Sequence, residues 1–211
     1  IINKTKAERY TQDGSKCPYC STSRNECRDL DHYIPRQLFP EFSIMSNNLI
    51  YVCSKCNQDY KKTKFLDSNK NRFFLNPYFD ECLSEEILKC EITIDGINLN
   101  IKFSIDSELK DRNDDAYIVA CNHLNTLKLD ERFGQNCETL KNSFIEAHCN
   151  PLITTHREIK NFTVEEAWIW IDYEIRKICR LSHPNNFELL FWIELKKCIE
   201  WFGNVSGKTI P

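Results

Sequence analysis

Hydrophobic and polar positions follow two different periods along the chain. Between residues 87 and 105 they alternate on both sides of the dipeptide Asp95-Gly96. Alternation of this kind indicates β-strands, and Asp-Gly is favoured in type I′ turns, so we expect a β-hairpin with this dipeptide at its tip. Beyond residue 114 the period becomes helical. This change predicts helices over 115–127 and 131–148.

The last third of the chain has the clearest helix signals. The sequence Thr163-Val-Glu-Glu166 has the form of a capping box, which predicts a helix running from there to about Leu181. A second helix is expected over 186–202, followed by Gly203 as a C-terminal cap. All four tryptophans fall within these two segments. We therefore expect an antiparallel helical hairpin with an aromatic core.

Two Cys-x-x-Cys pairs stand out among the twelve cysteines. They are Cys17 with Cys20 and Cys53 with Cys56, with 32 residues between the pairs. Each pair can place two sulfurs about 2.3 Å from one Zn²⁺, and four thiolates leave that ion no open position. A redox dithiol would explain one pair but not two. The spacing therefore predicts one structural zinc ion.

Polar residues that can carry chemistry lie beside these pairs. Asp31 and His32 end a predicted strand, Asn48 precedes the apolar run LIYVC, and Asn57 follows the second cysteine pair at the start of a predicted helix, SKCNQDYKKTKF. The expected order is strand, turn, strand and helix. Such a unit would direct polar side chains from its strands and its helix into one cleft.

These elements resemble the HNH endonucleases, also called ββα-metal nucleases. The resemblance covers residues 17–66 and consists of D-H-x-x-P, N-L and C-x-x-C-N in this order, with separations of 16 residues from His32 to Asn48 and 9 from Asn48 to Asn57. It implies an α+β fold and hydrolysis of phosphodiester bonds. By this resemblance His32 is the general base, Asp31 and Asn57 hold one Mg²⁺ or Mn²⁺, and Asn48 pins the motif loop and orients the base.

Alternatives remain for two of these positions. Asn47 could replace Asn48 if the register slips by one residue, and Asp29 could replace Asp31 as a cation ligand. The chain also departs from many HNH proteins, because the residue four positions after Asn57 is a lysine. An ammonium group suits a phosphate oxygen better than Mg²⁺, so the number of protein ligands to the cation stays open.

The distribution of charge points to nucleic acid at the N-terminal end. Residues 1–72 carry a net charge of +5 and residues 73–211 carry −8, for a total of −3. Basic side chains near the motif can contact phosphates without reading the base sequence. The predicted DNA contacts are Arg36, Lys55, Lys61, Lys62 and Lys64. DNA is the expected substrate, and two alternatives stay open: a non-catalytic zinc-ribbon module that binds nucleic acid or protein, and an HNH-type RNase.

Composition indicates a folded chain, and the motif covers only one part of it. Hydrophobic residues make up 41% and charged residues 28%, which excludes a disordered chain, and no apolar run could span a membrane. We expect a nuclease core with structural zinc over residues 1–80 and a hairpin with a helical docking region over 81–211. The absence of an N-terminal apolar segment favours a cytoplasmic location.

In its size and in the segment YFD (78–80) after the motif, the chain resembles bacterial HNH proteins that are effectors of antiphage defence. This likeness implies recruitment or restraint by an ATPase or sensor subunit, as an oligomer or a hetero-complex. Exposed aromatic residues near Trp201 and Phe202 are the expected docking face.

Overall fold

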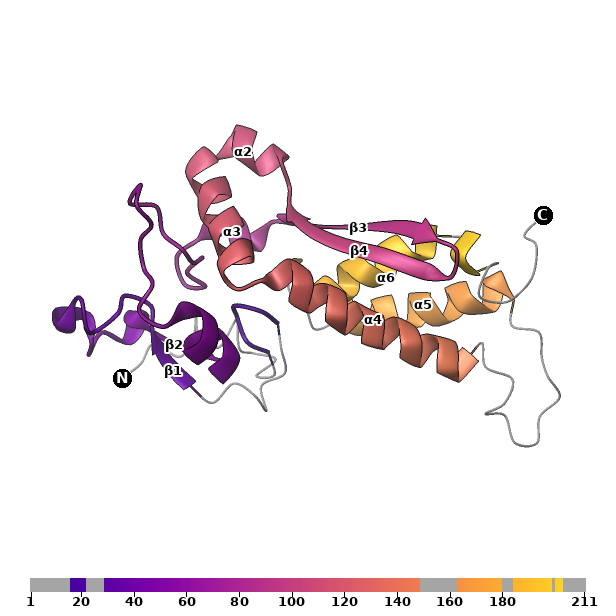
Figure 1. Cartoon of the computed structure of the whole chain (residues 1–211), viewed down its shortest axis with the longest axis horizontal. Coiled ribbons are helices and arrows are strands. Elements are labelled where there is room, and N and C mark those ends of the chain that lie inside the picture. The colour runs from indigo at the N-terminus through magenta and orange to yellow at the C-terminus, as the bar shows by residue number, and fades with distance from the viewer. Residues whose placement is uncertain (1–15, 22–28, 149–162, 180–183, 199, 203–211) are drawn as a thin grey trace. The chain divides into compact units, whose positions relative to one another are not determined.

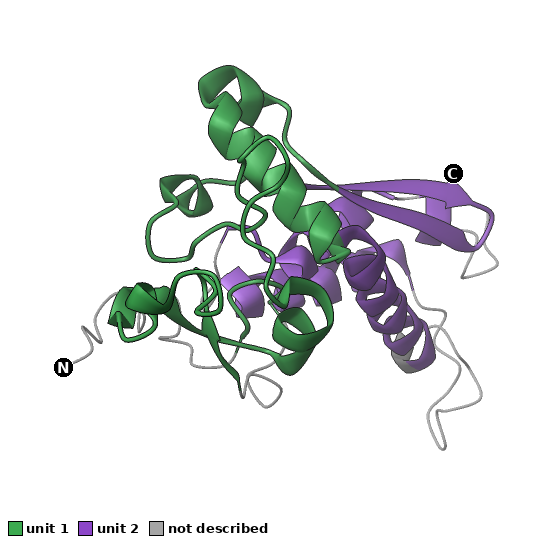
Figure 2. Cartoon of the chain, turned by 60° about the vertical axis from the view of Figure 1, so that its left-hand side comes forward, with its two compact units in different colours: residues 1–88, 104–129 green, residues 89–103, 130–211 purple. Residues whose placement is uncertain are grey.

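The fold is seen in a computed structural model that describes residues 16–21, 29–148, 163–179, 184–198 and 200–202. Figure 1 labels the helices and strands, and the chain forms two compact units, coloured separately in Figure 2. The first unit contains residues 1–88 and 104–129, and the second contains 89–103 and 130–211. Both helices and short strands are present, so the expectation of a mixed α+β fold is confirmed.

Two short antiparallel strands build the motif region of the first unit. Strand β1 (Asp29–His32) pairs with β2 (Leu49–Val52), with Asp31 opposite Ile50 and His32 opposite Leu49. Burial alternates along both strands, as the side chains of a two-stranded ribbon with one packed face should. Two 3₁₀ turns, η2 (Pro40–Phe42) and η3 (Ser46–Asn48), lie in the connection between the strands.

The helix predicted after the second cysteine pair is present but is wider than an α-helix. Element η4 (Lys55–Lys61) is a π-helix, and the N–H of Lys62 donates to the carbonyl of Asn57 at 2.8 Å. The expected order of strand, strand and helix is therefore observed. Single π-turns are rare and are often found at functional sites.

The first unit extends beyond the predicted boundary at residue 80. A 3₁₀ turn, η5 (Glu81–Ser84), and two helices, α2 (Glu108–Arg112) and α3 (Asp114–Thr126), belong to it. The physical reason is a shared hydrophobic core, in which the helices bury apolar side chains against the segment that follows the motif. The core residues are Leu75, Ile87, Leu109, Val119 and Ala120.

The predicted hairpin is formed by β3 (Leu88–Asp95) and β4 (Asn98–Ile105). Its turn differs from the prediction by one position. Among the described residues of the loop, only Gly96 has a positive φ, of 59°, so the two-residue turn is Gly96-Ile97 and not a type I′ turn centred on Asp95-Gly96. Glycine adopts this backbone conformation without steric cost.

The described part of the second unit contains three helices of more than ten residues. The sequence predicted helices here, and they are α4 (Leu129–His148), α5 (Val164–Cys179) and α6 (Phe187–Lys197). The capping box before α5 is formed, because the Thr163 N–H donates to Glu166 Oε2 at 3.0 Å and the Glu166 N–H donates to Thr163 Oγ1 at 3.2 Å. The predicted end of this helix at Leu181 lies outside the described residues.

Helix α6 is shorter than predicted. The Asn186 side chain caps its N-terminus by accepting from the N–H groups of Glu188 and Leu189. The helix ends at Lys197, because Cys198 leaves the helical conformation and its N–H turns back to the Leu195 carbonyl. Residues 200–202 are again helical, so the predicted helix is interrupted at Cys198. The predicted cap, Gly203, lies outside the described residues.

Aromatic side chains form the core of the second unit, as predicted. The Phe133 and Phe187 rings stack with centroids 4.5 Å apart. Trp201 is fully buried, and its indole N–H donates to the Ile97 carbonyl at 2.9 Å. Phe202 is only 4% exposed. The expectation that Trp201 and Phe202 form an exposed docking face is therefore wrong, because these rings build the core. No helix among the described residues is long and apolar enough to cross a membrane.

Candidate functional site

The four cysteines of the two Cys-x-x-Cys pairs meet at one buried point. The Sγ atoms of Cys17, Cys20, Cys53 and Cys56 lie within 4.8 Å of one another. Cys20 Sγ and Cys53 Sγ are 3.6 Å apart, close to the separation of about 3.8 Å that four sulfurs take around one zinc ion. The cluster can therefore hold one metal ion, and its all-sulfur donor set is of the kind used by structural zinc sites.

The surroundings of the sulfurs also suit a metal-bound thiolate. The backbone N–H of Cys53 donates to Cys17 Sγ at 3.3 Å, and that of Cys56 donates to Cys53 Sγ at 3.4 Å. Hydrogen bonds with the Cys17 and Cys20 thiols, together with burial, raise the pKa of Cys53 and of Cys56. The thiols stay protonated without a cation, so metal binding must displace protons and is coupled to folding of this region.

His32 lies at the end of β1, half-buried, with one ring nitrogen held in place. Its Nε2 is 3.1 Å from the backbone carbonyl oxygen of Ser43. A carbonyl can only accept a hydrogen bond, so Nε2 carries a proton, and in the neutral ring Nδ1 then keeps its lone pair. Within the described part of the chain, Nδ1 has no hydrogen-bond partner. This tautomer and orientation leave one nitrogen able to take a proton from a water molecule.

Asn48 holds the loop that carries the Ser43 carbonyl. Its Oδ1 accepts from the Ile34 N–H at 2.7 Å, and its Nδ2 donates to the carbonyls of Ile34 at 3.0 Å and Phe42 at 3.1 Å. The side chain is 5% exposed, whereas that of Asn47 is exposed to solvent. Of the two asparagines, Asn48 is therefore the one whose side chain holds this loop.

Asp31 points to the other face of β1 and is buried in an ion pair. Lys61 Nζ lies 3.0 Å from Asp31 Oδ1 and donates to the His32 carbonyl at 2.8 Å, and the Tyr19 hydroxyl donates to Asp31 Oδ2 at 3.4 Å. Burial raises the pKa of Asp31, although the Lys61 ammonium opposes this rise, and burial lowers the pKa of Lys61. These contacts tie two segments to β1: the first cysteine pair through Tyr19, and η4 through Lys61.

The prediction that Lys61 contacts DNA needs correction. Its side chain has no exposed surface, because the ammonium is taken inward by Asp31 and the His32 carbonyl. A group in this position cannot reach a phosphate on the protein surface. Arg36, Lys55, Lys62 and Lys64 are exposed, as a phosphate contact requires, and their role stays a prediction.

Asn57 is oriented by Asp29 rather than by Asp31. Its Nδ2 donates to Asp29 Oδ2 at 3.0 Å, and Ser54 and Gln58 donate to the same carboxylate. Partial burial raises the pKa of Asp29, but these hydrogen bonds outweigh it and the pKa lies below its ordinary value. With Nδ2 turned to Asp29, the amide oxygen Oδ1 is the atom of Asn57 that remains for a cation, and the described residues provide no partner for it.

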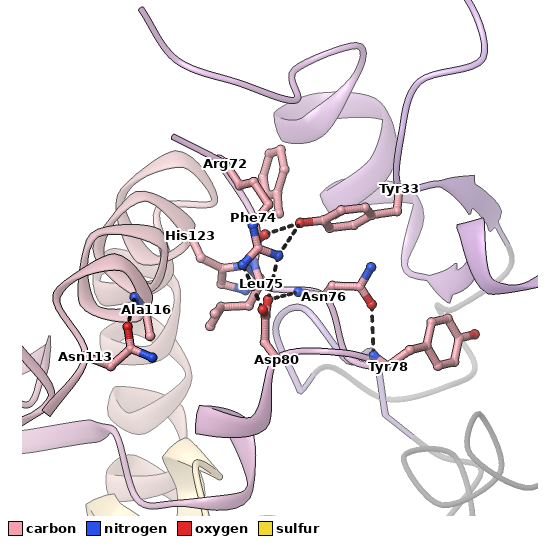
Figure 3. A network of polar contacts seen from close by, with 10 residues as sticks. All are labelled: Tyr33, Arg72, Phe74, Leu75, Asn76, Tyr78, Asp80, Asn113, Ala116 and His123. Atoms are coloured by element: carbon pink, nitrogen blue, oxygen red, sulfur yellow. Dashed lines mark hydrogen bonds and ion pairs between the residues drawn. The ribbon is translucent and has the colours of Figure 1, made fainter. Parts of the chain in front are cut away.

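A network around His123 holds the motif against the rest of the unit (Figure 3). His123 Nδ1 accepts from the Leu75 N–H at 3.1 Å, so Nε2 carries the proton and donates to the Tyr19 carbonyl at 3.0 Å. Through this hydrogen bond, α3 holds the segment that carries the first cysteine pair. No local sequence pattern separates His123 from the other histidines, because its partners come from distant segments.

A second part of the network holds Tyr33, the residue after His32. Arg72 forms a two-bond ion pair with Asp80, at 2.7 and 3.0 Å, and also donates to the Tyr33 hydroxyl at 3.1 Å (Figure 3). Burial raises the pKa of Tyr33 to about 12, so the hydroxyl stays protonated and donates to the Phe74 carbonyl at 2.6 Å. The chain on both sides of His32 is thus fixed.

Comparisons with known proteins find two distant relatives. The chain is 27% identical over 148 residues to Protein ea31 of Escherichia phage lambda, covering 66% of this chain and 49% of that protein. It is 28% identical over 98 residues to the Septu protein PtuB of Bacillus thuringiensis, covering 41% and 37%. The aligned segments thus span half or less of each relative. No protein-family profile and no solved structure matches the chain.

Proposed function

We propose that this protein is a divalent-metal-dependent endonuclease that hydrolyses DNA phosphodiester bonds, with His32 as the general base. One observation carries the proposal. The Ser43 carbonyl fixes the proton on Nε2 of His32, and Nδ1 is left with its lone pair. A neutral imidazole held in one orientation is suited to activating water at neutral pH. Asn48 supports this role by clamping the loop that supplies the carbonyl.

The proposal includes one Mg²⁺ or Mn²⁺ held by Asp31 and Asn57. Both offer the hard oxygen ligands that these cations prefer. Asp29 turns the Asn57 amide so that Oδ1 is available. Such a cation would stabilise charge on the phosphate and on the leaving oxygen. The cysteine cluster would hold a structural zinc ion and keep β2, η4 and the first cysteine pair together.

Exposed basic side chains would position the substrate. Arg36, Lys55, Lys62 and Lys64 would contact backbone phosphates, which orients the nucleic acid without reading its sequence. Because such contacts do not require a deoxyribose, an RNase of the same type is the second candidate. A series of substrates that differ only in the 2′-hydroxyl at each position separates the two.

The biological setting is part of the same proposal. The similarity to the Septu protein PtuB supports a role in bacterial antiphage defence as part of a Septu-type complex. A cytoplasmic location and an ATPase or sensor subunit as the partner complete the proposal. The similarity to a protein of Escherichia phage lambda shows that related chains are also carried by phages. Loss of phage protection on replacing His32, with protein levels unchanged, would tie the defence role to the nuclease site.

The decisive experiment is a plasmid cleavage assay with zinc quantification. Wild type is expected to nick or linearise supercoiled DNA with Mg²⁺ or Mn²⁺ but not with EDTA. His32→Ala is expected to abolish cleavage while the zinc content stays at about one ion per chain. Leu30→Ala changes an exposed residue of the same strand and serves as the matched control. Cleavage by His32→Ala at the wild-type rate would reject the proposed base. Bound zinc without cleavage by any variant would favour the non-catalytic zinc-ribbon module.

A further inference from the structure

The buried Lys61 side chain is the least expected feature of the site. The side chain is 0% exposed and that of Asp31 is 5% exposed. The ammonium has two oxygen acceptors, Asp31 Oδ1 and the His32 carbonyl, and lies 6.0 Å from the centre of the Phe74 ring. Lysine is almost never fully buried unless it is paired. Its charge is therefore matched inside the motif rather than by solvent.

Lys61 contacts both residues of the Asp31-His32 pair. Its side chain bonds to the carboxylate of the first residue and to the backbone carbonyl of the second. It also lies four positions after Asn57 on the same helix. A tethered cation thus occupies the carboxylate that the proposed function assigns to a divalent ion.

The second carboxylate oxygen is not open either. The Tyr19 hydroxyl donates to Asp31 Oδ2, and Tyr19 lies between the two cysteines of the first pair. A divalent ion that approaches Asp31 must therefore share or replace a contact that the free protein already makes. Two cations at one carboxylate repel each other, and this repulsion is strong where water is excluded.

We propose that the Lys61 ammonium competes with the divalent cation for Asp31 and sets the cation affinity of the free protein. The inference rests on the proposed function, because it uses Asp31 as the cation ligand. The ammonium keeps Asp31 neutralised and positioned when no cation is bound. A Mg²⁺ or Mn²⁺ ion held by Asp31 would displace Lys61 Nζ from Oδ1. Lys61 is thus a positioning residue, and it also holds the free protein in a state of low metal affinity.

The first test measures Mn²⁺ affinity by electron paramagnetic resonance on the full, zinc-loaded chain. Lys61→Met is expected to bind Mn²⁺ at least about ten-fold more tightly than wild type, because the competing charge is gone. Lys102→Met makes the same substitution at an exposed site in the second unit and should leave the affinity unchanged. Adding Asp31→Asn to Lys61→Met should remove the gain. Equal or weaker Mn²⁺ binding by a folded, zinc-loaded Lys61→Met would overturn the proposal.

A second test uses wild type and does not depend on the folding of a variant. Acetylation of lysines by a water-soluble reagent, read by mass spectrometry, is expected to spare Lys61 in the metal-free site and to modify it several-fold faster with saturating Mn²⁺. The exposed Lys102 should be modified equally in both conditions. Bound Mn²⁺ with Lys61 still protected would contradict the competition, and so would a failure of Mn²⁺ to bind even to Lys61→Met.

These readouts separate the inference from the nuclease proposal. Tighter Mn²⁺ binding by Lys61→Met without DNA cleavage by wild type would support the competition and reject the nuclease. Cleavage that depends on His32, with Mn²⁺ affinity unaffected by Lys61→Met, would support the nuclease and reject the competition.

Discussion

Replacing Asn48 tests whether one buried side chain holds the loop beside His32. Asn48→Ala removes three hydrogen bonds, two to Ile34 and one to Phe42. Each contributes about 1 kcal/mol net, so the loop should lose about 3 kcal/mol of local stability. The backbone groups of Ile34 and Phe42 would also lose their partners. We expect the loop to open about a hundred-fold more often, since every 1.4 kcal/mol is a factor of ten.

The assay is amide hydrogen exchange read on peptides that cover residues 33–48. Tryptophan fluorescence would not serve, because all four tryptophans belong to the second unit. The matched control is Asn47→Ala, because Asn47 is the neighbouring asparagine and is exposed. If the nuclease proposal holds, Asn48→Ala should also lower the cleavage rate by about 10- to 100-fold, since groups that orient a site residue typically matter by this amount.

One outcome would refute this reasoning. If the peptides of Asn48→Ala exchange as slowly as those of Asn47→Ala, then the three hydrogen bonds do not hold the loop. The Ser43 carbonyl would then have to be positioned by the turn itself, through contacts such as the Ser43 N–H to the Pro40 carbonyl at 3.1 Å.

Three further predictions concern the metal cluster, a carboxylate and a helix cap. Cys53→Ser should release the bound metal and unfold the motif region, whereas the exposed Cys179→Ser should keep both, as measured by metal analysis and limited proteolysis. The pKa of Asp29 is lowered in the folded state, so wild type should be more stable than Asp29→Asn above about pH 4. This difference in stability should vanish as the pH falls through the lower pKa of the folded state. A difference in denaturation midpoint that stays constant down to pH 3 would contradict the prediction. Thr163→Ala should cost about 1 kcal/mol in the second unit by tryptophan fluorescence, whereas Glu166→Gln, which keeps the capping oxygen, should cost little.

Local patterns predicted the elements of this protein and the four cysteines that meet in one cluster. Cys-x-x-Cys spacing, the alternation in the hairpin, and the Thr163 capping box each depend on residues close in sequence, so the sequence alone was sufficient for them. The buried Asn48 side chain also bonds locally. Its contacts cross a loop of only 14 residues, from Ile34 to Asn48.

Only the tertiary structure decided how charges and polar groups pair across the motif. Lys61 is 30 residues from Asp31, and nothing near either residue indicates that the lysine turns inward instead of toward solvent. Likewise, Asn57 pairs with Asp29 over 28 residues and His123 with Tyr19 over 104. Burial of a charge depends on which segments pack around it, and that is a property of the assembled fold. The boundary of the first unit follows the same rule, because α3 joins it through a core that no local pattern reveals.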